Sequence, residues 1–391
     1  MNGMNVWIIE PRDPLIVRDG RPFGPIPGAR ARSLPFPFPS TIAGGVRTRD
    51  GLDPEGRFKI SEIPRLKRIA VRGPLLVELD SSVGDIRAWF APAPADALLL
   101  DVDPPGSGRA VIKRLVPLRP PSGASTNLPP GLVPVGMPEP DPRKPCPTAP
   151  RFWNWERFER WLVDPQQEEV RLADLGCNGP IQETRTHVRI LGETGTGAEG
   201  ALFQTRGLEF TQADTRERLA LAVATDAPNL RVGVAPLGGE RRLVFWRKSN
   251  RHLPQCPAEL PKLIGEKGHC RVILLTPAHF LKGSMPSWLL EDRHGVQPSL
   301  AAMALPRAQV VSGWDLEKRK PKPTRRLAPA GTVLFFKLTG ETRAIQGWVE
   351  ALWMQCISDE EQARRDGFGL AVLGVWDGEL RPMRIGKEGS A

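Results

Sequence analysis

The chain contains 391 residues, of which 40% are hydrophobic and 25% are charged, as in globular proteins of one large or two medium domains. No apolar run approaches the roughly 18 residues that would suggest a membrane span, and we expect no membrane anchor. The first residues, MNGMNVWIIEPRDP, lack the pattern of a secretory signal. Lysine and arginine total 54 against 44 acidic residues, and the formal net charge of +10 favours a polyanionic partner, most commonly nucleic acid. A generally basic, soluble surface is the alternative.

The cysteines are odd in number and contain no C-x-x-C pair. They are Cys146, Cys177, Cys256, Cys270 and Cys356. This pattern matches neither a disulfide framework nor a zinc ribbon, so we expect a reducing, cytoplasmic location and no metal.

The first elements are predicted in the order strand, long loop, helix. Residues 6–10, VWIIE, form an apolar run typical of a buried strand. The stretch LPFPFPSTIAGG at 34–45 then places three prolines before a helix, for which Ser40 or Thr41 is the expected N-cap. Further strands are predicted at 71–79 and 96–103.

The middle of the chain begins with a proline-rich segment. Residues 116–150 contain 12 prolines, so we expect no regular element there. Residues 151–163, RFWNWERFERWLV, predict an amphipathic helix that packs Phe152, Trp155, Phe158 and Leu162 into the core. Residues 187–210 predict an extended β-hairpin with a tip rich in glycine and threonine.

The remaining segments predict strands of a second half and one long helix. RLALAVA, RRLVFWR, CRVILLTP and TVLFFKL are the expected strands, and residues 342–358 are expected to be helical. The predicted apolar face of that helix carries Ile345, Trp348, Val349, Leu352 and Cys356. The motif GFG and a last strand, LAVLGVW, follow.

This element order predicts an α+β fold of two tandem ferredoxin-like units. The final strand–helix–loop–strand order is half of such a unit, and the beginning of the chain offers a similar strand, loop and helix. We expect an N-terminal domain at 1–215, with an insertion around 116–165, and a C-terminal domain at 216–391 that carries the glycine-rich loop.

Catalytic and metal motifs are weak. The five histidines form no close pair or H-E-x-x-H motif, and Asp101-x-Asp103 is better explained as a strand entering a turn. GETGTGAEG lacks the Gly-Lys-Ser/Thr ending of a phosphate loop. His187 is the one candidate for a general acid or base, and an RNA contact or a packing role is the more common reading of such a residue.

Two segments concentrate positive charge. Arginines occur at 18, 21, 30, 32, 47 and 49, and the run WDLEKRKPKPTRR at 314–326 contains six cations. Either segment could be a solvated loop, but together they favour RNA. In the glycine loop, the N–H groups of Gly367 and Gly369 could converge on a phosphate, while Phe368 could stack on a base or pack inward.

Several segments together resemble a known family. VRDGRPF and LPFPFPSTIAGGVRTR are similar to the N-terminal signature of the third Cmr subunit of type III-B CRISPR effector complexes, within the RAMP superfamily. Later blocks of that family resemble, in order, HVRILGETGTGAEGALFQTRGLEF, LGGERRLVFW, SGWDLEKRKPKPTRRLAPAGTVLFF and GFGLAVLGVW. The resemblance therefore spans nearly the whole chain, apart from the proline-rich segment at 116–150.

The resemblance implies a non-enzymatic subunit without a cofactor, built from two RRM-type domains. The subunit would hold the 5′ tag of the crRNA at one end of a hetero-oligomeric ribonucleoprotein. It would contact the large polymerase-like subunit and the first backbone subunit there. The predicted RNA-binding residues are Arg18, Arg21, Ser40, Thr41, Arg47, His187, Arg189, Lys318, Arg319, Lys320, Lys322, Gly367, Phe368 and Gly369.

Two other functions are left open. The chain could be a metal-independent endoribonuclease that cuts the CRISPR repeat, with His187 near the scissile 2′-hydroxyl. It could also be a pure assembly subunit, whose basic loops meet acidic protein surfaces.

Overall fold

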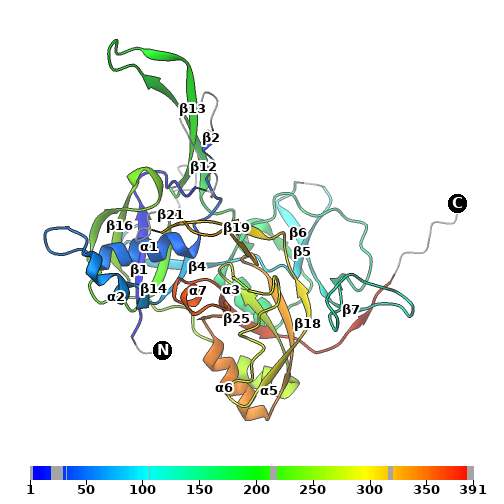
Figure 1. Cartoon of the computed structure of the whole chain (residues 1–391). Coiled ribbons are helices and arrows are strands. Elements are labelled where there is room, and N and C mark those ends of the chain that lie inside the picture. Colours follow the sequence, from blue (N-terminus) through cyan, green and yellow to red (C-terminus); the bar gives the residue numbers. More distant parts are fainter. Residues whose placement is uncertain are drawn as a thin grey trace.

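The computed structural model describes residues 3–18, 30, 31, 33–104, 106–211, 218–315 and 320–384. The fold is α+β, as predicted, and most neighbouring strands pair antiparallel. Two large sheets form the body, and one long hairpin projects from it (Figure 1).

The larger sheet has eight strands, and every neighbouring pair in it is antiparallel. In sheet order the strands are β11 (Gly176–Cys177), β9 (Phe152–Asn154), β4 (Ile86–Pro92), β3 (Val71–Leu79), β14 (Leu219–Thr225), β1 (Asn5–Pro11), β16 (Leu243–Lys248) and β15 (Gly233–Pro236). The predicted strands at 6–10 and 71–79 are thereby confirmed.

The chain returns to this sheet after residue 216. Strand β14 lies between β3 and β1, and β16 pairs with the other edge of β1. RLALAVA and RRLVFWR are therefore strands, but the prediction that they belong to the second half is wrong. A boundary at 215/216 would separate these strands from the sheet that they complete.

Helices cover one face of the larger sheet. Helix α1 (Pro39–Asp50) packs Ile42, Ala43 and Val46 into a core with Trp7 and Trp246. A short 3₁₀ turn, η1 (Ile60–Glu62), leads into α2 (Ile63–Arg68). Gly45 fits closely into this packing, because a Cβ atom there would lie 2.6 Å from a methyl carbon of Leu237 and would displace it.

The second sheet has five antiparallel strands. In sheet order they are β18 (Gln297–Ala304), β23 (Val333–Thr339), β17 (His269–Leu274), β25 (Leu370–Val375) and β24 (Gln355–Cys356). Helices α5 (Leu260–Lys267) and α6 (Thr342–Leu352) contribute to its core. Helix α6 buries Ile345, Trp348, Val349 and Leu352 as predicted, but it ends before Cys356, which lies in β24.

The segment between the two sheets is more regular than predicted. It contains β5 (Ala97–Asp101), β6 (Arg109–Arg114), β7 (Val116–Arg119), β8 (Val135–Gly136), α3 (Trp155–Val163), β10 (Glu169–Arg171) and α4 (Leu172–Leu175). The prediction that 116–150 holds no regular element is wrong for β7 and β8, which pair with each other; β7 also pairs with β26 (Arg381–Pro382). Phe152 lies in β9 rather than in the predicted helix, because α3 begins after the Asn154 cap.

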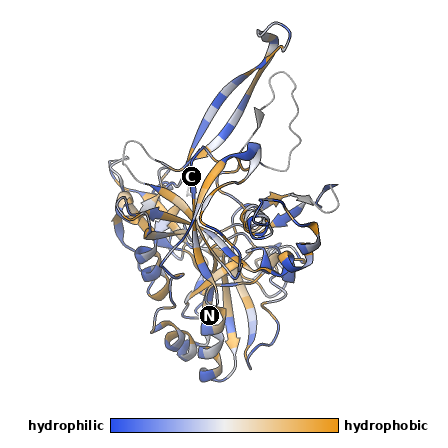
Figure 2. Cartoon of the chain, turned by 90° about the vertical axis from the view of Figure 1, so that its left-hand side faces the viewer, coloured by the Kyte–Doolittle hydropathy of each residue, from blue (hydrophilic) through white to orange (hydrophobic). Residues whose placement is uncertain are grey.

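The smaller elements complete the fold. They are the sheet of β12 (Ile181–Ile190), β13 (Gly197–Glu209) and β2 (Arg30–Ala31), the pairs β19 (Gln309–Val311) with β22 (Arg325–Leu327) and β20 (Trp314–Asp315) with β21 (Lys320–Pro321), the 3₁₀ turn η2 (Gly239–Arg241) and α7 (Glu361–Arg365). Hydrophobic residues concentrate in the sheets of the body, while blue and pale bands alternate along the projecting hairpin (Figure 2). Within the described ranges, every helix is too short or too polar to cross a membrane.

Candidate nucleic-acid interface

The projecting hairpin confirms the prediction at 187–210 and begins earlier, at Ile181. Strands β12 and β13 pair antiparallel from Ile181 opposite Glu209 to Val188 opposite Leu202. At the turn, the Leu191 N–H donates to the Thr196 carbonyl at 2.8 Å, and Gly195 adopts φ +66, which favours glycine. The hairpin stands clear of the two large sheets (Figure 1).

One face of the hairpin combines aromatic rings with cations. His187 lies opposite Phe203, and their rings stack at 5.2 Å between centroids and 17° between planes. The His187 Nε2 atom lies 3.0 Å from Thr205 Oγ1. Arg185 lies opposite Thr205 on the same face, because side chains two residues apart in a strand share a face. Its guanidinium donates to Glu183 at 2.7 Å and is half exposed.

The opposite face of the hairpin has a different character. Thr186 faces Gln204 across the strands, and Val188 faces Leu202 nearer the tip. Leu202 and Ile190 are 58% and 57% exposed, so these apolar residues of the outer hairpin are not buried against the described part of the chain. Arg189 follows Val188 where the pairing register shifts, so the register assigns it to neither face; it is exposed.

The described part of the basic N-terminal segment includes β2, which lies beside this hairpin. Strand β2 pairs parallel with β13, with Arg30 opposite Gln204. Arg18 is exposed, and its backbone forms an isolated antiparallel β-bridge with Ser33, whose hydroxyl accepts the Val17 N–H at 3.1 Å. The backbone of β2 therefore lies next to β13, on the side of β13 away from β12. Arg21, also predicted to bind RNA, lies outside the described residues.

The start of α1 differs from the prediction. Phe38 is the N-cap residue and Pro39 is the first helical residue, so the prediction that Ser40 or Thr41 caps the helix is wrong. The Thr41 N–H already donates to the Phe38 carbonyl at 3.0 Å. Phe38 is buried beside Phe368, and Phe36 lies 5.1 Å from the Phe152 ring, so both phenylalanines of LPFPFPS brace the segment on the protein.

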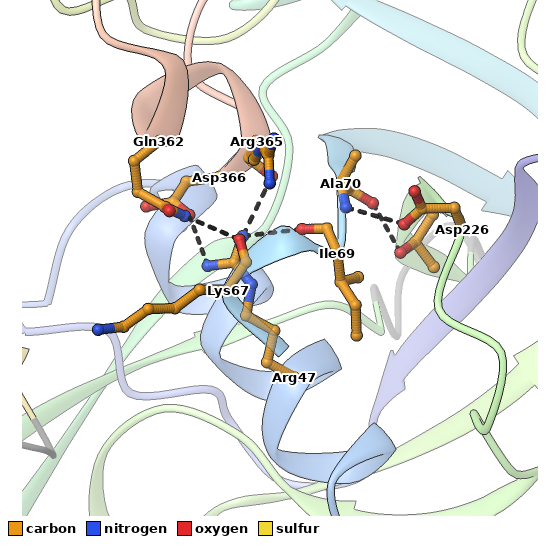
Figure 3. A network of polar contacts seen from close by, with 9 residues as sticks. Arg47, Lys67, Ile69, Ala70, Asp226, Gln362, Arg365 and Asp366 are labelled. Carbon is orange, nitrogen blue, oxygen red and sulfur yellow. Dashed lines mark hydrogen bonds and ion pairs between the residues drawn. The ribbon is translucent and has the colours of Figure 1, made fainter. Parts of the chain in front are cut away.

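Arg47 is occupied by internal partners (Figure 3). Its guanidinium lies 2.5 Å from Asp366 at the end of α7 and donates to the Ile69 and Arg365 carbonyls at 2.9 and 3.3 Å. Both side chains of the ion pair are only 15% exposed. These contacts join α1 to the C-terminal half and account for Arg47 without RNA.

The glycine loop is packed and its donors are used. The N–H groups of Gly367, Phe368 and Gly369 donate to the carbonyls of Arg364, Ala363 and Pro277 at 3.1, 3.0 and 2.8 Å. Phe368 is 6% exposed. The interpretation of this loop as a phosphate nest is therefore wrong, and of the two roles considered for Phe368 the structure supports inward packing.

The second basic run is described only in part. Lys320 and Lys322 are exposed, and the Lys322 N–H donates to the Gly313 carbonyl at 2.7 Å. Arg325 in β22 forms an ion pair with Glu360 at 3.0 Å. Lys318 and Arg319 lie outside the described residues.

A pocket of about 350 Å³ lies beside α3, and none of the predicted RNA-binding residues that the structure describes lines it. Its lining contains two arginines and four carboxylates, Glu159, Asp164, Glu168 and Glu259. This excess of negative charge opposes a phosphate backbone.

Sequence reasoning missed the partners of His187. Arg185, His187 and Arg189 alternate in the sequence, and this period of two predicts that residues of β12 share a face. The contribution of Phe203 required the pairing register, which the sequence pattern of either strand alone does not fix.

Comparison with known proteins agrees with the resemblance seen in the sequence. The family model for CRISPR-associated protein (Cas_Cmr3) matches residues 7–376. A chain from a cryo-EM structure of the type III-B Cmr-beta bound to cognate target RNA and AMPPnP, state 1, has a TM-score of 0.46 and 14% identity over 89% of this chain and 88% of that chain. A second, from the type III-B Cmr-beta bound to cognate target RNA, has a TM-score of 0.46 and 15% identity, with coverage of 84% and 86%.

No curated protein matches the sequence. The family model nevertheless covers nearly the whole chain, from β1 to the end of the second sheet. The chain therefore belongs to the Cmr3 family of CRISPR-associated proteins.

Proposed function

We propose that this protein is a non-catalytic RNA-binding subunit of a type III-B Cmr effector complex that holds the 5′ tag of the crRNA. In that complex it bridges the large polymerase-like subunit to the first backbone subunit. The observation that carries the RNA role is the hairpin face on which the stacked His187–Phe203 pair lies beside Arg185. Family membership and the net charge of +10 support the same role.

The geometry suits single-stranded RNA. An aromatic pair offers a surface on which an unpaired base can stack, at about 1–3 kcal/mol per base. Arg185 and Arg189 are exposed and supply guanidinium donors for phosphate oxygens. Arg18, which is exposed near the base of the hairpin strands, is a further candidate for a phosphate contact. The architecture that we propose for this role is two tandem ferredoxin-like domains, and the five-stranded sheet with α5 and α6 supports the second of them.

The RNA role is tested by fluorescence anisotropy with repeat-derived RNA that carries the tag. A variant with Arg185→Gln, His187→Ala and Arg189→Gln is expected to bind at least about tenfold more weakly, since it loses one stacking surface and two phosphate contacts. The matched control carries Thr184→Ala, Thr186→Ala and Gln204→Ala and alters the other face of the same hairpin. Equal loss in both variants, or loss in neither, would contradict the proposed face.

Salt dependence provides a second reading of the same titration. Each phosphate contact on a single strand contributes a log–log slope of about −0.7. The wild-type slope is expected to become less negative by about 1.4 in the Arg185, His187 and Arg189 variant, since two contacts are lost. An unchanged slope would indicate that these arginines do not bind phosphates.

The non-catalytic assignment has a separate test. End-labelled repeat RNA is incubated with the protein in EDTA and run on a denaturing gel, and the RNA is expected to stay intact. His187 is held against Phe203 and Thr205 in the hairpin, an arrangement suited to stacking. Specific cleavage that is lost in His187→Ala would make the protein a metal-independent endoribonuclease instead.

A further inference from the structure

A second arginine cluster lies on the larger sheet, around the buried carboxylate of Glu10. The two Glu10 oxygens receive Arg218 Nη2 and Arg247 Nη2, each at 2.5 Å, and Arg12 Nη2 lies at 3.8 Å. The Glu10 side chain is 10% exposed, whereas that of Arg12 is 52% exposed. Asp13 adds a second carboxylate here, because it accepts the Leu243 N–H at 3.2 Å. The described cluster therefore has three guanidiniums against two carboxylates and keeps a net positive charge.

Phe245 holds this cluster in place. It lies directly opposite Glu10 in the β1–β16 pair. The guanidinium carbons of Arg12 and Arg247 lie 5.3 and 5.9 Å from the centre of its ring, within the range of cation–π attraction. The arginines are thus oriented before any partner arrives, which reduces the entropy lost on binding.

Exposed aliphatic side chains border the arginines. Val234 lies opposite Phe245 in the β15–β16 pair, and Leu243 is two residues before Phe245 in β16, so all three share a face. Val232, Val234 and Leu243 are 63%, 54% and 41% exposed. We call this surface, made of Arg12, Arg218, Arg247, Phe245, Val232, Val234 and Leu243, the Phe245 face.

The free edge of the sheet is a poorer binding site than this face. Pro236 in β15 has no N–H to donate, and Arg49 donates to the carbonyls of Arg231 and Gly233 at 2.8 and 3.3 Å. These contacts hinder the addition of another strand to β15. A partner therefore meets side chains of the Phe245 face rather than the backbone of the edge.

We propose that the Phe245 face docks a protein subunit that presents a carboxylate flanked by aliphatic side chains. Arginine and aromatic residues next to a small apolar area are typical of binding hot spots between proteins. RNA fits less well, because aliphatic side chains offer a phosphate no hydrogen bond and the Phe245 ring is already flanked by two guanidiniums. The inference rests on the proposed function in one respect: the partner belongs to the same effector complex.

The test measures binding of the full chain to the large polymerase-like subunit and to the first backbone subunit, each purified and RNase-treated. Arg12→Glu and Val234→Ser are each expected to weaken binding of one subunit by about tenfold or more, as at interface hot spots. Arg12→Gln removes the positive charge without adding a negative one, so it can still be tested if Arg12→Glu fails to fold. The control is Arg87→Glu, because Arg87 is 67% exposed and lies in β4, which β3 and β14 separate from β1 in the sheet.

Affinity for repeat-derived RNA is measured for the same proteins. Unchanged RNA affinity with weakened subunit binding supports the proposal. Unchanged subunit binding in Arg12→Glu, Arg12→Gln and Val234→Ser overturns it while leaving the RNA role intact. Weakened RNA affinity with unchanged subunit binding also overturns it, because the face would then be an RNA surface. A fourth outcome is that the variants lose subunit binding and the wild-type protein does not bind tag RNA. That result would support docking at the Phe245 face and contradict the proposed RNA role.

Discussion

Arg271 is a fully buried cation whose described partners lie on several elements. Its guanidinium donates to Asp96 at 2.5 Å, to the Trp161 carbonyl at 2.5 Å and to the Val375 carbonyl at 2.9 Å. Asp96 also receives the indole N–H of Trp161 at 2.9 Å. Because these residues lie in β17, before β5, in α3 and in β25, one network ties the middle segment to the second sheet.

Arg271→Met is expected to lower the free energy of unfolding by about 3–5 kcal/mol, since it leaves the Asp96 charge buried without its cation. Urea unfolding followed by tryptophan fluorescence measures the change. Arg57→Ala serves as the control, because Arg57 is 76% exposed and its loss is expected to cost less than about 0.5 kcal/mol. A loss as small as that of the control would show that the network contributes little stability.

The variant Arg47→Ala tests whether Arg47, which was predicted to contact RNA, stabilises the fold instead. Arg47→Ala removes the ion pair with Asp366 and two bonds to carbonyls, so we expect a loss of about 1.5–3 kcal/mol in stability. Affinity for tag RNA at a temperature where the variant is folded is expected to stay within about twofold of wild type, a difference well below one hydrogen bond. A large fall in RNA affinity with unchanged stability would show that Arg47 contacts RNA directly.

The cysteines give a pH dependence with a defined sign. Burial raises the pKa of Cys356 from 9.0 to about 12, and burial also raises the pKa of Cys256 to about 12. The stability that these neutral thiols contribute is fully present below pH 9.0 and declines between about pH 9 and pH 12, as the unfolded chain ionises first.

Native protein at pH 8 is therefore expected to react slowly with a disulfide reagent at Cys256 and Cys356, and all five cysteines are expected to react after denaturation. Mass spectrometry of the labelled peptides identifies the sites. Rapid native labelling of Cys356 would contradict its burial.

At the scale of elements, the sequence predicts the hairpin correctly, but it does not predict how the glycine loop packs. Alternation along β12 and a glycine-rich tip are local signals of a hairpin. The carbonyl partners of Gly367 and Gly369 are set by their place against the sheet and α7, so the same Gly-x-Gly pattern is compatible with a phosphate nest or a packed turn. The α1 cap was missed because the sequence also offers Ser40 and Thr41, although a proline at the first helical position is itself a known start signal.

The outer half of the hairpin is expected to be dispensable for folding. Replacing residues 189–201 by a short turn removes side chains such as Ile190 that are already exposed, so little buried apolar area is lost. Differential scanning fluorimetry is expected to give a Tm within about 2 °C of wild type, while the affinity for tag RNA falls. A large fall in Tm would show that the hairpin is part of the folding core.

At the scale of the whole molecule, the fold class and most strands followed from the sequence, but their grouping did not. Periodicity indicates that 219–225 and 243–248 are strands, yet it does not indicate that they return to β1 across more than 200 residues. For the same reason the sequence does not reveal that Arg47 pairs with Asp366, which lies 319 positions along the chain. Long-range pairing thus decides which basic residues face solvent and which hold the two halves together.

The measurement that tests the central claim most directly is site-specific photocrosslinking from the hairpin to crRNA. A photoreactive phenylalanine analogue replaces Phe203, or Gln204 on the opposite face, in the effector complex reconstituted with crRNA. The account predicts strong crosslinks from position 203 to nucleotides of the 5′ tag and weaker ones from position 204. Crosslinks from position 203 only to protein, or only to RNA outside the tag, would contradict it.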